Sequence, residues 1–122
     1  VLKEFHEGII ALSACLAGEV AVNLRKGNYA GAKEAALRHL DIFGENNYFL
    51  EMQDHGIPDQ ATVNAGVMRL SKELGIPMVV TNDSHYIYAE DADAHDILLC
   101  IQTNKKVSDT DRMKYDGGQY YL

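Results

Sequence analysis

The sequence predicts an α/β fold in which parallel strands are flanked by helices. Three short apolar segments of strand character alternate with longer segments whose apolar residues recur at helical spacing, in the order β-α-α-β-α-β-α. Strands that are joined through helices pair in parallel, because a tight hairpin cannot connect them. Three strands are too few to close a barrel, so we expect the chain to be part of a larger α/β domain.

The first strand is predicted within residues 8–13, a short apolar run that is typical of a buried parallel strand. A turn rich in small residues follows it. The next segment is helical, because Val20 and Leu24 fall on one face, and Gly27 ends it.

The second helix is predicted over residues 29–42, which are rich in Ala and Leu. Asn28 is a favourable N-cap for this helix, and Gly44 ends it. The second strand follows at residues 47–52, which combine aromatic and apolar side chains.

A third helix is predicted to begin at Pro58, because proline is tolerated in a first helical turn, and to end at Gly75. Apolar residues recur at helical spacing between these positions: Val63, Val67, Leu70 and Leu74. Residues 77–81 form the third strand, and a loop leads to a last helix over residues 89–102, whose acidic first turn suits the helix dipole. The residues after this helix are polar and irregular.

The composition indicates a globular protein, with 47% hydrophobic and 24% charged residues among 122. No apolar run approaches the roughly 18–20 residues of a membrane span, no signal peptide opens the chain, and two distant cysteines indicate no disulfide framework, so we expect a cytoplasmic protein. The formal net charge is −7, and residues 51–100 hold nine acids against two bases. Such a surface repels phosphate, which argues against a stand-alone nucleic-acid-binding protein, but acids beside histidines can hold a cation.

Each predicted strand is followed by side chains that bind metals or transfer protons. They are Ser13 and Cys15 after the first strand, Glu51, Asp54 and His55 after the second, and Asn82, Asp83 and His85 after the third. Because the carboxyl ends of parallel strands meet at one edge of a sheet, we expect these side chains to converge. Asp83 and His85 are two apart, so in an extended segment they point the same way. Carboxylate, imidazole and thiolate groups bind Zn²⁺, Mn²⁺ or Fe, so a metal or acid–base site is predicted.

Each of these residues also has a simpler interpretation. A lone cysteine such as Cys15 is more often a small buried residue than a ligand. Asp83 can cap a loop, and His55 can shape a turn. His95 and Cys100, on the last predicted helix, are more simply core or surface residues. The coincidence of ligand-type residues at three strand ends is what favours a site.

Four blocks of the sequence carry a resemblance to a known family: residues 11–19 (ALSACLAGE), 48–56 (YFLEMQDHG), 80–86 (VTNDSHY) and 93–103 (DAHDILLCIQT). In this order they resemble the polymerase-and-histidinol-phosphatase (PHP) domain of the bacterial DNA polymerase III alpha subunit. The resemblance implies a distorted (β/α)7 barrel. It also implies that residues 1–105 are the C-terminal portion of the PHP domain and that residues 106–122 are a linker toward a polymerase core.

The resemblance further implies a cluster of His, Asp, Glu and Cys residues that holds several divalent metal ions, Zn or Mn. Three positions of that cluster match Cys15, Asp83 and His85. Glu51 and His55 match the family's sequence near the ligands, so we place them in the surroundings of the site. The other ligands belong to earlier barrel segments, and the catalytic carboxylates of the polymerase, which use Mg, lie downstream.

A metal cluster of this kind suits the hydrolysis of a phosphoester. The resemblance therefore implies a fragment of a replicative DNA-directed DNA polymerase, a nucleotidyltransferase, with a 3′→5′ exonuclease activity in its PHP domain. The isolated fragment is expected to be inactive, because three ligands leave the site incomplete. Two alternatives stay open: a non-catalytic scaffold that docks a separate proofreading subunit, and a stand-alone PHP phosphatase. The implied partners are DNA, the proofreading subunit and the sliding clamp, with no membrane.

Overall fold

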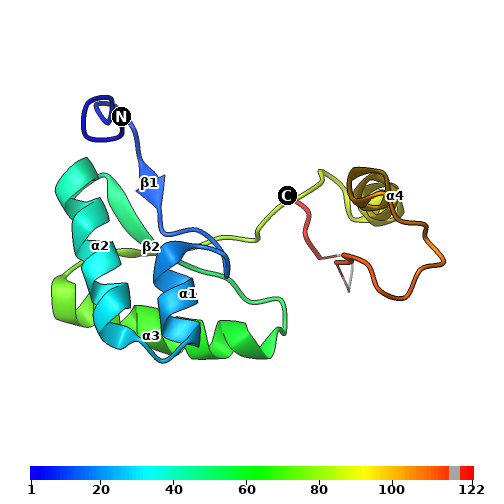
Figure 1. Cartoon of the computed structure of the whole chain (residues 1–122). Helices are drawn as coiled ribbons and strands as arrows, with labels where there is room; N and C mark the ends of the chain where they lie inside the picture. Colours follow the sequence, from blue (N-terminus) through cyan, green and yellow to red (C-terminus); the bar gives the residue numbers. More distant parts are fainter. Residues whose placement is uncertain (116–118) are drawn as a thin grey trace. The chain divides into compact units, whose positions relative to one another are not determined.

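The computed structural model describes residues 1–115 and 119–122 of the chain. These residues form two compact units, residues 1–81 and residues 82–122. Within the described residues, the first unit contains three strands and three α-helices, and the second contains one α-helix that follows a short 3₁₀ turn (Figure 1). None of the described helices is both long and apolar enough to cross a membrane.

The strands of the first unit form a parallel sheet in the order β1-β2-β3. They are β1 (Ala11–Leu12), β2 (Tyr48–Met52) and β3 (Met78–Val80). Ala11 pairs with Tyr48, and Leu50 pairs with Met78. This pairing confirms the predicted parallel α/β arrangement and brings the carboxyl ends of the three strands to one edge. Closure into a (β/α)7 barrel stays a prediction.

The first strand differs from the expectation of a buried strand over residues 8–13. Only Ala11 and Leu12 pair with β2, and Ile9 and Ile10 are 42% and 66% exposed. The reason is the position of β1 at the edge of the sheet, where the described residues supply a neighbour on one side only. Apolar composition predicted the strand, but burial depends on which elements cover it.

The three helices of the first unit follow the predicted bounds closely: α1 (Glu19–Arg25), α2 (Tyr29–Phe43) and α3 (Pro58–Leu74). The Asn28 side chain caps α2 by accepting a hydrogen bond from the Gly31 backbone N–H at 3.1 Å. Gly75 ends α3 with a left-handed φ of 71°, which glycine adopts without a steric cost. Local signals therefore define both of these helix ends.

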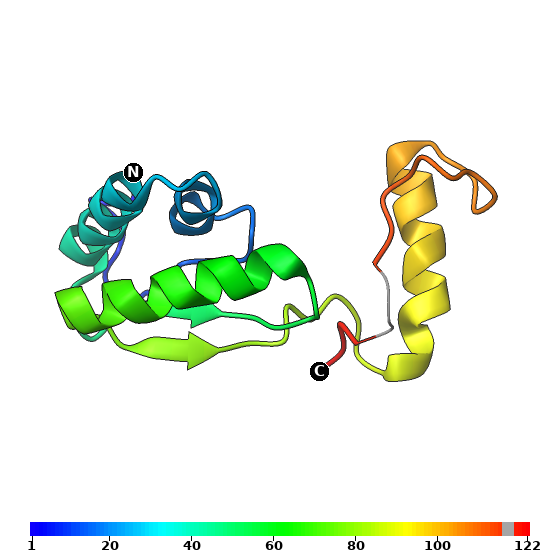
Figure 2. The same cartoon turned by 90° about the horizontal axis from the view of Figure 1, so that it is seen from below.

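The core of the first unit lies between the helices and β2. Tyr48 and Leu50 on β2 are 1% and 0% exposed. α1 packs against both α2 and α3, and α3 lies along β2 (Figure 2). The buried residues of α2 are mostly alanines, Ala32, Ala35 and Ala36, whose small side chains let the helices approach closely.

The second unit contains α4 (Ala92–Thr103), which follows the 3₁₀ turn η1 (Ala89–Asp91). An ion pair holds α4 to the irregular segment after it: Arg112 donates to both carboxylate oxygens of Asp96, at 2.6 and 2.9 Å. The Arg112 side chain is only 7% exposed and that of Asp96 is 21% exposed. The Arg112 guanidinium lowers the pKa of the Asp96 carboxyl below its ordinary value.

We predict that Leu50→Ala destabilises the fold by about 2–5 kcal/mol, because it leaves a cavity in the centre of the sheet. Urea unfolding of the chain measures this loss. The control is Leu37→Ala on α2, where the side chain is 42% exposed, and its cost should stay below about 1 kcal/mol. Equal losses in the two variants would show that the core does not lie where we place it.

We predict that Asp96→Asn lowers the thermal stability of the chain at neutral pH. A carboxyl group whose pKa is lower in the folded than in the unfolded state stabilises the fold above its unfolded pKa, near 3.8. This stabilisation is lost as the pH falls through the lower folded pKa. Melting curves from pH 7 down to about pH 2 should therefore show wild type and variant converging at acid pH. A difference that is independent of pH would contradict the ion pair's role.

Candidate metal site

The turn after β1 positions Cys15 through two backbone constraints. Ala14 has a φ of 66°, a left-handed conformation that is uncommon for alanine. Gly18 closes the turn by donating its N–H to the Cys15 carbonyl at 2.9 Å. A Cβ atom at position 18 would lie 2.4 Å from the Ser13 carbonyl oxygen, so only glycine fits there. The small residues of this turn are therefore a steric requirement for the position of Cys15.

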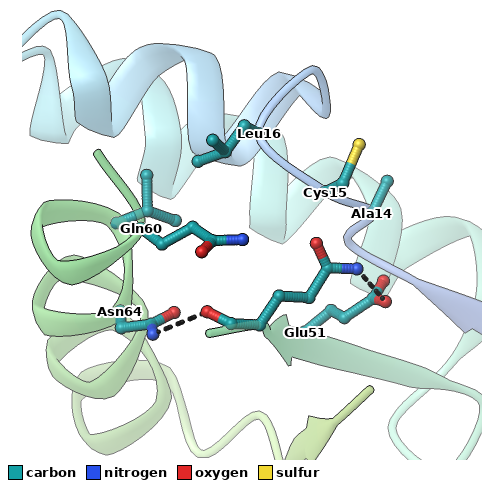
Figure 3. Close-up of a pocket in the computed structure, with 8 residues that line it drawn as sticks. Ala14, Cys15, Leu16, Glu51, Gln60 and Asn64 are labelled. Atoms are coloured by element: carbon teal, nitrogen blue, oxygen red, sulfur yellow. Dashed lines mark hydrogen bonds between the residues drawn. The ribbon is translucent and has the colours of Figure 1, made fainter. Parts of the chain in front are cut away.

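Cys15 lies in the turn after β1, and Glu51 lies near the carboxyl end of β2. The two residues line one pocket at the carboxyl edge of the sheet (Figure 3). Gln60 and Asn64, on α3, line the same pocket. In Figure 3 the Cys15 thiol points away from the Glu51 carboxylate. The two side chains thus face one pocket from neighbouring strands without pointing at each other.

A hydrogen-bond network fixes the Glu51 carboxylate. Its Oε1 atom accepts hydrogen bonds from the Thr81 hydroxyl and from Gln53 Nε2, the latter at 3.1 Å. Gln53 Nε2 also lies 3.1 Å from Thr81 Oγ1, and the Glu51 backbone N–H donates to Ser13 Oγ at 2.8 Å. The ends of all three strands are therefore joined through polar side chains, and Glu51 is held in one orientation.

His55 contacts Gln60, one of the residues that line this pocket, and is 8% exposed. Its backbone N–H donates to Gln60 Oε1 at 2.7 Å, and Gln60 Nε2 lies 3.0 Å from His55 Nδ1. Because an amide nitrogen only donates, Nδ1 is the acceptor, and the proton of the neutral ring is on Nε2. His55 therefore positions Gln60. Asp54 is exposed and accepts from the Gly56 N–H at 3.1 Å, which is an ordinary turn contact.

Tyr48 lies close to the Cys15 turn, in a second hollow that Ser13, Gly18 and His39 also line. His39 stacks on the Tyr48 ring with centroids 5.6 Å apart and is half-buried. Burial, and secondly the negative charge of Glu19, raises the pKa of Tyr48 to about 12. The phenol is therefore neutral at physiological pH.

Asp83 and His85 form a close pair in the second unit. His85 Nε2 lies 3.5 Å from Asp83 Oδ1, and the two side chains are 32% and 29% exposed. The segment is not extended as predicted, because Asp83 has a left-handed φ of 49°. The side chains still approach each other, and a backbone strained at such a residue is common in functional sites.

The ligand-type side chains thus lie in two places: Cys15 and Glu51 line one pocket of the first unit, and Asp83 and His85 approach each other in the second. Within residues 1–115 and 119–122, no group of three or more His, Cys, Asp or Glu side chains is placed to hold a metal ion. The donor atoms in these two places, a thiolate, two carboxylates and an imidazole, nevertheless fit Zn²⁺ or Mn²⁺.

Sequence reasoning missed three residues that shape these two places. Gln53 and Thr81 hold the Glu51 carboxylate, and the ring of His95 packs against that of His85 with centroids 5.4 Å apart. The positions of two of them carried a usable signal. Gln53 is two residues after Glu51, and Thr81 directly follows β3, so both fall at the strand ends where polar side chains were expected to converge.

Comparison with known proteins points to one family. Residues 1–55 match the family model for the PHP domain. The whole chain is 46% identical to the DNA polymerase III subunit alpha of Saccharopolyspora erythraea and 45% identical to that of Treponema pallidum, over 122 residues in each case. The corresponding subunit of Campylobacter jejuni is 42% identical over 132 residues. The chain covers 10% of the length of the first two relatives and 11% of the third.

We predict unequal effects for two single-methyl changes in the Cys15 turn. Gly18→Ala should destabilise the fold by about 1–3 kcal/mol, because the added Cβ meets the Ser13 carbonyl. Ala14→Gly removes a left-handed strain of about 1 kcal/mol from the folded state. It also raises the conformational entropy of the unfolded chain, which lowers the free energy of unfolding by a similar amount, so stability should change little. Urea unfolding compares the two variants. A tolerated Gly18→Ala, or a strongly destabilising Ala14→Gly, would refute this description of the turn.

Proposed function

This chain belongs to the family of bacterial DNA polymerase III alpha subunits and corresponds to the region of their PHP domain, and we propose that it is a segment of a replicative DNA-directed DNA polymerase. In this proposal the segment contributes Cys15, Asp83 and His85 to a multi-metal site for 3′→5′ exonuclease or phosphoesterase hydrolysis. The metals are Zn or Mn, and Mg serves a separate polymerase core.

The observation that carries the proposal is the placement of donor-type side chains after strands that share one carboxyl edge. Cys15 and Glu51 line one pocket there, and Asp83 and His85 form a pair 3.5 Å apart just after β3. Ligand sites of parallel α/β folds gather at this edge. The resemblance to the PHP domain implies metal ligands at three of these residues, Cys15, Asp83 and His85, and this supports the proposal.

The chain's own residues have distinct roles in the proposed site. The Cys15 thiolate, the Asp83 carboxylate and the His85 imidazole hold metal, and Thr81 and Gln53 orient Glu51 beside Cys15. Bound metal supplies a water molecule of lowered pKa and stabilises the leaving oxyanion of the phosphoester. Because the chain has a net charge of −7, it repels the DNA phosphates. In this proposal the DNA backbone is therefore bound by metal ions and by other parts of the protein.

A second candidate is a scaffold domain that docks a separate proofreading subunit and performs no chemistry. Two observations favour it: the described residues contain no three-ligand group, and α4 exposes apolar side chains. These are Ile97, Leu98 and Ile101, which are 52%, 62% and 71% exposed. In either case the proposed setting is the cytoplasmic replicase, with DNA, the proofreading subunit and the sliding clamp as partners.

The test is the metal content of the full-length protein, measured by elemental analysis after dialysis. We predict bound Zn or Mn in wild type. In Cys15→Ser and in Asp83→Asn the affinity for that metal should be at least ~10-fold weaker, so less metal is retained after dialysis, because each variant loses a ligand. Exonuclease activity on single-stranded DNA should fall in parallel.

The matched control is Cys100→Ser, which changes the same chemical group at a buried position on α4. It should keep both metal and hydrolytic activity. A wild-type protein without metal favours the scaffold. A protein whose metal content is the same in Cys15→Ser as in wild type would refute the ligand assignment.

A further inference from the structure

The loop that carries Asp83 and His85 is tied to the last residues of the chain. We define the ligand loop as residues 82–86 and the strap as residues 119–121. Asn82 Nδ2 donates to the strap carbonyls of Gln119, at 2.9 Å, and of Tyr121, at 2.6 Å. A side chain that holds two carbonyls at once fixes the distance between them, so Asn82 links the ligand loop to both ends of the strap.

Further hydrogen bonds run along the same junction. The His85 backbone N–H donates to the Tyr120 carbonyl at 2.7 Å, and the Ser84 hydroxyl donates to the Tyr121 carbonyl at 3.0 Å. In the other direction, the Tyr120 N–H donates to the Tyr86 hydroxyl at 3.2 Å. The strap therefore contacts the loop on both sides of His85 and through the backbone of His85 itself.

Three aromatic rings pack around the His85 imidazole, whose side chain stays 32% exposed. Its ring centroid lies 4.5 Å from that of Tyr115, 5.4 Å from that of His95 and 6.0 Å from that of Tyr120. Tyr115 also packs edge-on against Tyr120, with centroids 4.8 Å apart. Packing on several sides restricts the rotamers of His85, which leaves its Nε2 beside the Asp83 carboxylate.

We infer that the strap positions Asp83 and His85 for metal binding and that Asn82 is the main positioning residue. The inference rests on the proposed function in one respect only, the assignment of Asp83 and His85 as ligands. It gives residues 119–121 a role beyond that of a linker. Asp83, which has a left-handed φ of 49°, directly follows Asn82.

The experiment compares Asn82→Leu with Asn46→Leu in the full-length protein. Leucine is close to asparagine in size and lacks the amide donor. Asn46 is exposed and lies in the turn before β2, so its variant repeats the chemical change away from the ligand loop. The two readouts are hydrogen exchange of a peptide spanning residues 82–88 and the affinity and absorption spectrum of bound Co²⁺.

We expect at least ~10-fold faster exchange of the His85 and Tyr86 amides in Asn82→Leu, and a Co²⁺ affinity ~10–100-fold weaker with an altered spectrum. The melting temperature of Asn82→Leu should change little. In Asn46→Leu, both the hydrogen exchange and the Co²⁺ binding should stay close to those of wild type. Because the Co²⁺ spectrum reports ligand geometry, a purely structural role for Asn82 would leave it unchanged.

Unchanged exchange in Asn82→Leu would overturn the inference, because the strap would not hold the loop. Faster exchange with unchanged Co²⁺ affinity and spectrum would also overturn it, because the strap would then not position ligands. A wild-type protein that binds no Co²⁺ contradicts the proposed function instead. In that case, faster exchange in Asn82→Leu still supports the strap as the element that holds the loop.

Discussion

The parallel register of β1, β2 and β3 is the constraint on which the first unit's polar edge depends. Met52 pairs with Val80, so β2 and β3 end together, and β1, which pairs with Tyr48 and Phe49, leads directly into Ser13. Only in this register can the Glu51 backbone N–H donate to Ser13 Oγ and the Thr81 hydroxyl donate to the Glu51 carboxylate. A slip of β2 by one residue would turn Glu51 toward the helices and place Leu50 at the pocket, because neighbouring side chains in a strand face opposite ways.

The helices could be predicted closely because their ends are encoded by single residues. Asn28 caps α2 with its own side chain, Pro58 begins α3, and Gly75 ends α3 in a left-handed conformation. These signals act within one turn of the chain and need no tertiary information. The exposure of Ile9 and Ile10 could not be predicted in this way, because an apolar run says nothing about which elements will cover it.

The residue types of the candidate site can be read from the sequence, but its local geometry cannot. Donor side chains at strand ends are visible in the sequence, whereas the contacts of the Asp83 loop with residues 119–121 join segments that are more than thirty residues apart. Glu51 and Asp96 also show why the net charge of −7 was a weak guide to function. One is held by Gln53 and Thr81 and the other by Arg112, so neither is a freely solvated surface acid.

The central claim is that Cys15, Asp83 and His85 are metal ligands. Anomalous diffraction from crystals of the full-length protein, collected at the absorption edge of the bound metal, tests it most directly. The account predicts anomalous peaks about 2.0–2.3 Å from the Cys15 Sγ and from a His85 ring nitrogen, as in zinc sites, with an Asp83 oxygen at a similar distance. The absence of a metal peak beside Cys15, or beside Asp83 and His85, would contradict the claim.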